Sequence, residues 1–280
     1  MSDDPIRVSP GWLALREPAD AAARARDLAE HLSRRRPAAG RWEIHDLGGG
    51  TGAMGRWLTP RLPGPQHWVV HDRDEDLLAL AAAHSPGPAA DGAAVTVETR
   101  RSDIIRLDPG VLAGAALITA SALLDMLTAH EVTELVSLCA GPGCPVLLAL
   151  SVIGRVDIAP AEPFDRRVAD AFNAHQRRDT ERGALLGPDA ATFAADAFRE
   201  RDAEVLVRHS PWRLGREAAE LTAQWFSGWV GAACEQDEAL AAEAGDYSRR
   251  RLAQLAAGDL AVTVGHADLL VLPRSASSPG

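Results

Sequence analysis

Short apolar runs alternate with amphipathic segments through the first half of the chain. Runs rich in aliphatic and β-branched residues predict strands, and apolar positions at helical spacing predict the helices between them. The predicted strands are Trp42–Leu47, His67–His71, Val95–Thr99, Ala116–Ser121 and Pro145–Ile153. The predicted helices are Ala53–Leu58, Glu75–His84 and Thr128–Cys139. This alternation favours βαβ crossovers, a mostly parallel sheet and ligand binding beyond the carboxyl ends of the strands.

The pattern is mainly helical on both sides of this region. Upstream, an amphipathic stretch predicts one helix over Pro18–Ser33, with Pro18 in its first turn. Downstream, a polar stretch runs from Ala159 to Leu186. Beyond it the pattern predicts a helix, a sixth strand, two more helices and a seventh strand, at Asp189–Glu200, Ala203–Arg208, Gly215–Glu235, Glu238–Ala257 and Ala261–Leu272. We therefore expect an α/β fold with seven strands and helical insertions.

Composition narrows the class of protein. With 280 residues, 46% of them hydrophobic, the chain can bury a sizeable core but is short for two full domains. Its formal net charge of −10 argues against a nucleic-acid partner, because phosphate binding needs a positive field. The segment Met1–Pro5 lacks the apolar core of a signal peptide, and no apolar run reaches the ~20 residues of a membrane helix. Three cysteines without a CxxC pair indicate free thiols, no metal site and a cytoplasmic location.

Glycines crowd the turn between the first predicted strand and the next helix. Gly48, Gly50 and Gly52 have no Cβ, so this turn can adopt positive φ and let a ligand approach the backbone closely. Two ligands fit the pattern. The segment Gly50–Gly55 has the G-x-G-x-x-G spacing of dinucleotide binders. The longer segment Asp46–Gly52 has the form [D/E]-x-G-x-G-x-G, in which an acid enters the loop.

The second form resembles the first motif of the class I S-adenosylmethionine-dependent methyltransferases, small-molecule type. The resemblance spans roughly Trp42–Ile153, about two-fifths of the chain. It implies a Rossmann-like, mostly parallel seven-stranded sheet with helices on both faces, an N-terminal helix and helical lid insertions. Asp46 separates the two ligands, because a carboxylate suits the sulfonium and ammonium of S-adenosylmethionine and repels a pyrophosphate.

The resemblance also implies cofactor contacts beyond the glycine loop. An acid at the end of the second strand would accept hydrogen bonds from the ribose hydroxyls. An acid after the third strand would receive the adenine amino group, with an apolar neighbour against the ring, and the end of the fourth strand would lie beneath the transferred methyl group. The cofactor residues so implied are Asp46, Gly48, Gly50, Gly52, Asp72, Arg73, Asp103, Ile104 and Ser121.

Candidates for catalysis and acceptor binding lie outside these motifs. His175 is the predicted general base, because histidine titrates near neutrality and this family commonly builds substrate contacts after the fifth strand. Asp125 is the second predicted catalytic residue, since many small-molecule methyltransferases carry a polar residue there that faces the substrate. The predicted acceptor-binding residues are Trp12, Arg16, Asn173, Gln176 and Trp212.

These assignments give a domain plan and a reaction. We expect an N-terminal helical cap at residues 1–40 and a cofactor-binding methyltransferase domain at residues 41–280, with insertions at about 159–187 and 212–258. The expected reaction moves a methyl group from S-adenosylmethionine to an oxygen, nitrogen or carbon atom of a small or medium-sized acceptor, leaving S-adenosylhomocysteine. An NAD(P)-dependent oxidoreductase and a non-catalytic S-adenosylmethionine-binding protein are the alternatives, and a homodimer is left open. The chain lacks the Asn/Asp-Pro-Pro-aromatic sequence of enzymes that methylate nucleic-acid bases, which also disfavours a nucleic-acid substrate.

Overall fold

A central sheet organises the chain in the computed structural model, which describes residues 8–35, 37 and 40–273. Seven strands follow the order β3, β2, β1, β4, β5, β10 and β8, and β9 pairs with β10 beside this path. Strands β1 to β5 are parallel to their neighbours among themselves, whereas β10 runs antiparallel to both β5 and β8. The bounds are β1 (Trp42–Leu47), β2 (Gln66–Asp72), β3 (Val95–Arg101), β4 (Leu117–Ser121), β5 (Val146–Ala159), β8 (Glu204–His209), β9 (Trp212–Leu214) and β10 (Ala261–Leu272).

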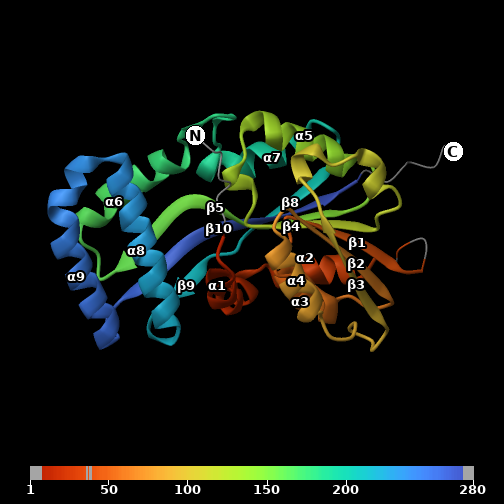
Figure 1. The fold of residues 1–280 in the computed structure, drawn as a ribbon, viewed down its shortest axis with the longest axis horizontal. Helices are drawn as coiled ribbons and strands as arrows, with labels where there is room; N and C mark the ends of the chain where they lie inside the picture. The colour runs from red at the N-terminus through yellow and green to blue at the C-terminus, as the bar shows by residue number, and fades with distance from the viewer. Residues whose placement is uncertain (1–7, 36, 38–39, 274–280) are drawn as a thin grey trace.

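Helices cover both faces of the sheet. Figure 1 shows α5 and α7 on one face and α2, α3 and α4 on the other, while α6, α8 and α9 form a lobe beyond the carboxyl end of β5 and the amino end of β10. The bounds are α1 (Pro10–Ala23), α2 (Arg26–Ser33), α3 (Ala53–Leu58), α4 (Glu75–Ala83), α5 (Ala129–Ala140), α6 (Pro163–Gln176), α7 (Ala190–Arg199), α8 (Ala219–Gln236) and α9 (Ala241–Ala257). The predicted Rossmann-like α/β fold is thus confirmed.

Two long strands, β5 and β10, connect the lobe to the rest of the sheet. β5 continues to Ala159 rather than ending at Ile153, because β10 pairs with it along this whole length. The polar stretch 159–186, for which the pattern predicts no element, contains α6 and a two-stranded hairpin, β6 (Asp179–Thr180) and β7 (Gly183–Ala184). Helix α6 starts with a reciprocal cap between Glu162 and Asp165, and it buries only a narrow apolar stripe.

The N-terminal helix differs from its prediction. The chain forms two helices, α1 and α2, and Pro18 lies inside α1 rather than in a first turn. Helix α1 begins earlier, at Pro10, behind a serine cap. It ends before Arg24, and the next N–H, of Ala25, donates to the Asp268 carboxylate at 2.8 Å instead of to the helix. The prediction of a single helix over 18–33 was wrong. The contact that interrupts the helix joins residues 243 positions apart, so the local pattern does not show it.

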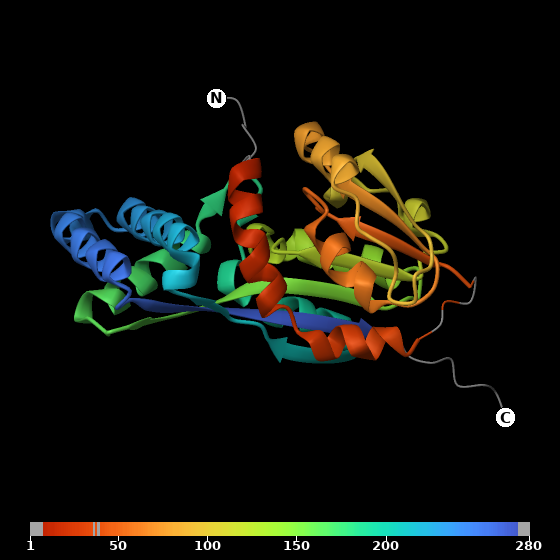
Figure 2. The ribbon, with the colours of Figure 1, turned by 90° about the horizontal axis from the view of Figure 1, so that it is seen from below.

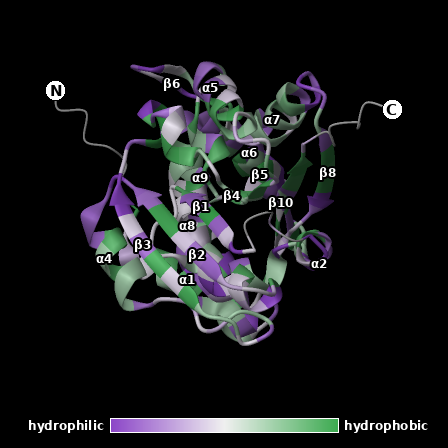
Figure 3. Ribbon diagram, turned by 90° about the vertical axis from the view of Figure 1, so that its right-hand side faces the viewer, coloured by the Kyte–Doolittle hydropathy of each residue, from purple (hydrophilic) through white to green (hydrophobic). Residues whose placement is uncertain are grey.

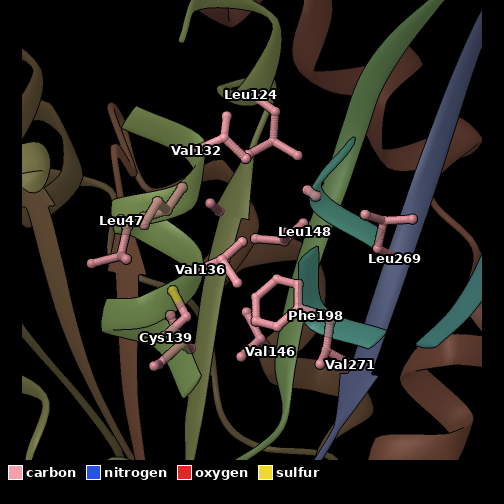
Figure 4. Packing of buried hydrophobic residues seen from close by; sticks show 14 of the residues in the cluster. Leu47, Leu124, Val132, Val136, Cys139, Val146, Leu148, Phe198, Leu269 and Val271 are labelled. Atoms are coloured by element: carbon pink, nitrogen blue, oxygen red, sulfur yellow. The ribbon is translucent and has the colours of Figure 1, made fainter. Parts of the chain in front are cut away.

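Among the described residues, three large apolar cores stabilise the fold. The first lies between the sheet and α5 and α7, where side chains such as Leu47, Val136, Val146 and Phe198 point toward one another (Figure 4). The second fills the lobe, and partly buried residues of α1 pack against it. Since other residues of the α1–α2 segment pack against the core beneath α2 and α3, this segment ties the lobe to the sheet.

The edge of the sheet away from the lobe is polar. Strand β3 forms this edge, and its carboxyl-terminal part, from Glu98 to Arg101, is hydrophilic (Figure 3). Glu98 and Arg100 form an ion pair there at 2.6 Å, which is the kind of charged edge that disfavours pairing with another chain. Among the described residues, no helix has the length and apolar character needed to cross a membrane.

Candidate functional site

The glycine turn follows β1 and opens α3. Gly48, Gly50 and Gly52 have φ of 64°, 53° and 79°, which a residue with a Cβ rarely adopts. The Gly50 N–H donates to Asp72 Oδ2 at 2.9 Å, so the end of β2 holds the turn in place. The other oxygen, Oδ1, accepts the Asp74 N–H at 3.0 Å. Asp72 therefore fixes the loop while its remaining lone pairs stay available to a ligand hydroxyl.

Asp46 is buried directly beneath this turn. Its side chain has no solvent exposure, and Thr119 Oγ1 donates to its Oδ1 at 2.7 Å. The second oxygen, Oδ2, has no hydrogen-bond partner. A Cβ at Gly49 would lie 2.6 Å from this oxygen and 2.7 Å from Val70 Cγ1, so only glycine fits over the carboxylate. Burial raises the pKa of Asp46 to about 7, against the opposing effect of the Thr119 hydrogen bond.

A buried arginine lies near the same carboxylate. Arg24 is 2% exposed, and its Nη2 donates to Ser121 Oγ at 3.2 Å, while Nε and Nη1 have no partner. Burial lowers the pKa of Arg24, and the carboxylates of Asp20, Asp268 and Asp46 act in the opposite direction. Buried charges normally have their hydrogen-bonding atoms satisfied. Arg24 and Asp46 therefore leave opposite charges with unused hydrogen-bonding capacity at the carboxyl ends of β1 and β4.

Sequence reasoning missed Arg24. It lies in no motif, and the contact that breaks the helix beside it comes from the far end of the chain.

The remaining predicted cofactor residues also lie beyond the carboxyl ends of the parallel strands. Ile104 Cδ1 is 3.9 Å from where a Cβ at Gly48 would lie, so the segment after β3 borders the loop. Asp103 is exposed, and its Oδ1 accepts the Ile105 N–H at 3.1 Å as a cap. Arg73 is also exposed and follows β2. Their roles toward a cofactor stay predictions.

A cavity of about 220 Å³ lies between the sheet ends, α1 and the lobe. All five predicted acceptor-binding residues line it, and so does Asp125, whose pKa is raised by burial. The lining residues that had been predicted are Trp12, Arg16, Asp125, Asn173, Gln176 and Trp212. Residues from α1, the segment after β4, β5, α6, β9, α8 and β10 meet here, so the fold brings together segments that lie far apart in the chain.

Helix α1 joins this cavity to the glycine turn. Arg16 Nε donates to Asp20 Oδ2 at 2.9 Å, and the Trp212 indole N–H donates to the other oxygen of Asp20 at 2.9 Å. The Arg16 guanidinium lies 5.0 Å from the centre of the Trp212 ring. On the neighbouring part of the helix, Leu13 Cδ1 comes within 3.5 Å of a Cβ placed at Gly50. Figure 2 shows α1 standing between the lobe and the glycine-loop side of the sheet.

Strained backbone borders the cavity. Ala122 and Leu150 have φ of 52° and 57°, although neither is glycine, and both line the cavity. The buried Asp268 carboxylate accepts the Leu150 N–H at 2.8 Å, and Ala149 accepts the Ala122 N–H at 2.9 Å. Strain of this kind costs about 1–3 kcal/mol per residue and clusters at functional sites.

His266 is a second residue that the sequence reasoning missed. It is 2% exposed and lines the cavity, and its Nδ1 has no hydrogen-bond partner. A register shift in the β5–β10 pairing between Val264 and His266 turns this part of β10, and bulges often re-aim side chains at active sites. Burial lowers the pKa of His266 to about 4, and Arg16 adds to this effect. In the sequence it stands within an apolar strand pattern, where a histidine reads as a core residue.

His175 lies elsewhere on α6. It is not among the residues that line the cavity, although its neighbours Asn173 and Gln176 are. Burial lowers the pKa of His175, with a further contribution from Arg178. Its predicted role as the general base stays a prediction. Among the described residues, no cluster of three or more His, Cys, Asp or Glu side chains could hold a metal ion.

The chain was compared with known proteins by sequence and by structure, and only the structural comparison finds matches. No protein-family model matches the chain, and no curated protein sequence matches it. Solved structures of similar shape include YjhP from E. coli, at 13% identity and a TM-score of 0.44 over 94% of this chain and 99% of that one. A SAM-dependent methyltransferase from Geobacter sulfurreducens, in complex with S-adenosyl-L-homocysteine, is 14% identical, with a TM-score of 0.42 over 95% and 99%. The mycolic acid cyclopropane synthase CmaA1, complexed with SAH and CTAB, is 13% identical, with a TM-score of 0.44 over 86% and 82%. Identities and TM-scores this low do not carry a function to this chain.

Proposed function

We propose that this chain is an S-adenosylmethionine-dependent methyltransferase that acts on a small or medium-sized acceptor. The observation that carries the proposal is the pair of buried, incompletely hydrogen-bonded charges, Asp46 and Arg24, beside a turn of glycines. An α-amino acid group carries an ammonium and a carboxylate, so it can satisfy both at once. A dinucleotide pyrophosphate would bring two negative charges to Asp46 and leave its carboxylate unsatisfied. The oxidoreductase alternative is therefore less favoured.

The residues present fit this cofactor. Asp46 Oδ2 would accept the ammonium, and Arg24, together with Ser121, would hold the carboxylate. Asp72 would accept the ribose hydroxyls at the end of β2. Asp103 and Ile104, with Arg73 nearby, would border the adenine, and Gly48, Gly50 and Gly52 would let the cofactor lie against the backbone.

The cavity supplies the acceptor side of the reaction. When bound, the cofactor provides a methyl group already activated on a sulfonium. The chain then has to hold a nucleophile behind that methyl group and exclude water, and such positioning can lower a barrier by roughly 7–11 kcal/mol. Helix α1 covers both the glycine turn and the cavity, so it would help to position the nucleophile and to exclude water. Asp125 and His175 stay the proposed catalytic residues from the sequence, and Trp12, Arg16, Asn173, Gln176 and Trp212 the proposed acceptor contacts.

The structure also supports the proposed domain plan. Helices α1 and α2 fall within the N-terminal cap, α6 within the first insertion, and β9, α8 and α9 within the second. A cytoplasmic location remains a prediction from the sequence, which leaves a homodimer open.

A panel of ligands tests the proposed function directly. We expect S-adenosylhomocysteine to raise the melting temperature of the full chain by several degrees, because a ligand at about 100 times its Kd adds about 2.7 kcal/mol to stability. NADH and NADPH should leave the melting temperature unchanged. Stabilisation by a dinucleotide and not by S-adenosylhomocysteine would replace this proposal with the oxidoreductase.

Arg24 should act on one end of the cofactor only. We expect Arg24→Met to weaken S-adenosylhomocysteine binding by about tenfold or more, since a hydrogen bond to a charged group is worth about 1.5–3 kcal/mol. Binding of 5′-methylthioadenosine, which has no amino acid end, should change less than about twofold. Calorimetric titration of both ligands measures this, with the exposed Arg26→Met as the matched control. An equal loss for both ligands would show that Arg24 supports the fold rather than the carboxylate.

A further inference from the structure

The cavity has the size of a small aromatic molecule. Its volume is about 220 Å³, whereas a cavity of about 150 Å³ in another protein holds benzene. The available space therefore suits one substituted ring or two fused rings. Four aromatic side chains, Trp12, Phe172, Trp212 and Trp225, contribute to the walls. Aromatic walls favour a flat partner that can stack or meet them edge to face.

The charges around the cavity are largely neutralised by one another. Arg16 donates through two nitrogens to Asp20, at 2.9 and 3.2 Å. Arg155, also on the wall, pairs with Asp157 at 2.8 Å. Burial raises the pKa of Asp125, which favours its uncharged form. An ionised acceptor would find no unpaired opposite charge among these groups, so the walls favour an uncharged one.

Two polar atoms at the cavity could accept a hydrogen bond but have no donor. Gln176 Oε1 and His266 Nδ1 are buried without a hydrogen-bond partner, and both residues line the cavity. Neutral imidazole has one donor and one acceptor nitrogen, so the unpartnered Nδ1 can serve as the acceptor when the other ring nitrogen carries the hydrogen. An acceptor molecule with a hydroxyl or an amine would supply the missing hydrogen.

We propose, building on the methyltransferase function above, that the acceptor is a flat, uncharged aromatic molecule with a hydroxyl or amine, and that His266 accepts the hydrogen of that group. During transfer a bond forms between the acceptor oxygen or nitrogen and the methyl carbon, while the carbon–sulfur bond breaks and its electron pair stays on sulfur. The acceptor's proton moves to His266. The ring is uncharged near neutral pH because burial and the Arg16 charge lower the pKa of His266 to about 4.

Binding of three matched probes tests this assignment without the natural acceptor. The probes are 2-naphthol, 2-methoxynaphthalene, which lacks the polar hydrogen, and decahydro-2-naphthol, which is not flat. Dissociation constants are measured by saturation-transfer NMR on the full chain, with and without saturating S-adenosylhomocysteine. We expect 2-naphthol to bind about tenfold more tightly than 2-methoxynaphthalene and about fivefold more tightly than decahydro-2-naphthol.

Variants of His266 connect the preference to this residue. His266→Phe keeps a ring against Trp212 but removes both nitrogens, so it should reduce the preference for 2-naphthol over 2-methoxynaphthalene to less than about twofold. His266→Gln restores an acceptor and should recover part of the preference. The exposed His130→Phe serves as the matched control and should behave as the parent does.

Each outcome decides the assignment. Loss of the preference in His266→Phe with recovery in His266→Gln supports it. A preference that survives His266→Phe, equal binding of the flat and saturated alcohols, or no binding of 2-naphthol at millimolar concentration overturns it. The proposed function is judged separately, by whether S-adenosylhomocysteine binds in the same samples. A chain that binds this compound but shows none of the naphthol pattern keeps the function and loses the acceptor class.

Discussion

Replacing Asp72 with alanine is expected to weaken S-adenosylhomocysteine binding about a hundredfold. The carboxylate accepts the Gly50 N–H at 2.9 Å and the Asp74 N–H at 3.0 Å, so it shapes the glycine turn before any ligand arrives. It would also accept the ribose hydroxyls. Hydrogen bonds to a charged group are worth about 1.5–3 kcal/mol each, and the loss of two such contacts gives at least this factor. Calorimetric titration of the purified variant measures the change.

A neighbouring aspartate separates this effect from a general loss of negative charge. Asp76 lies in the first turn of α4 and is exposed, so Asp76→Ala removes the same charge four residues away. We expect this control to bind S-adenosylhomocysteine within about twofold of the parent, because exposed charges contribute little. Asp72→Ala should still melt cooperatively. A folded Asp72→Ala variant with parental affinity would place the cofactor somewhere other than the glycine turn.

Local sequence signals are enough for most of the sheet. The strands from β1 to β4 and β10 match their predicted ranges within a few residues, because each contains aliphatic or β-branched residues and is bounded by turn residues. The glycine turn is equally local, since Gly48, Gly50 and Gly52 reflect backbone angles that their own residue type permits. Features that depend on distant partners were missed. The α1–α2 break is one, because it requires Asp268, and the extension of β5 is another, because it requires β10.

The residues of the site also fall into those that local sequence signals predict and those that depend on distant contacts. Cofactor residues could be placed from spacing, whereas Arg24 and His266 become visible only once the fold buries them without satisfying all their polar atoms. The aromatic and polar residues Trp12, Asn173 and Trp212 could be singled out from the sequence, but not the reason that they meet. Trp212 donates to Asp20 on α1, a contact between residues 192 positions apart. His175 and Asn173 share one helix, and only the three-dimensional arrangement separates them into one residue off the cavity wall and one on it.

The buried charges at the carboxyl ends of β1 and β4 lower the stability of the free protein. Asp46 has one oxygen without a partner, and Arg24 has two nitrogens without partners. A buried polar atom left unsatisfied costs about 1–3 kcal/mol, so apolar residues here would give a more stable protein. A ligand that carries both an ammonium and a carboxylate would recover this free energy on binding. The arrangement is thus explained by binding and not by folding.

Asp46 should make cofactor binding depend on pH. Burial raises the pKa of Asp46 to about 7, so the side chain is mostly protonated below neutrality and mostly ionised above it. A positively charged ligand group favours the ionised form, and the proton must leave when the ligand binds. The ionised fraction falls from about nine-tenths at pH 8 to about one-tenth at pH 6, so the apparent Kd should rise about tenfold as the pH falls. Asp46→Asn cannot ionise, so it should bind more weakly at pH 8 and lose this dependence.

Calorimetric titration of S-adenosylhomocysteine at pH 6 and pH 8, into the parent chain and into Asp46→Asn, measures the role of Asp46 in cofactor binding. We expect about tenfold weaker binding at the lower pH for the parent and a nearly constant, weaker affinity for the variant. Equal affinities for the two proteins at pH 8 would show that Asp46 does not recognise the ammonium group of the cofactor.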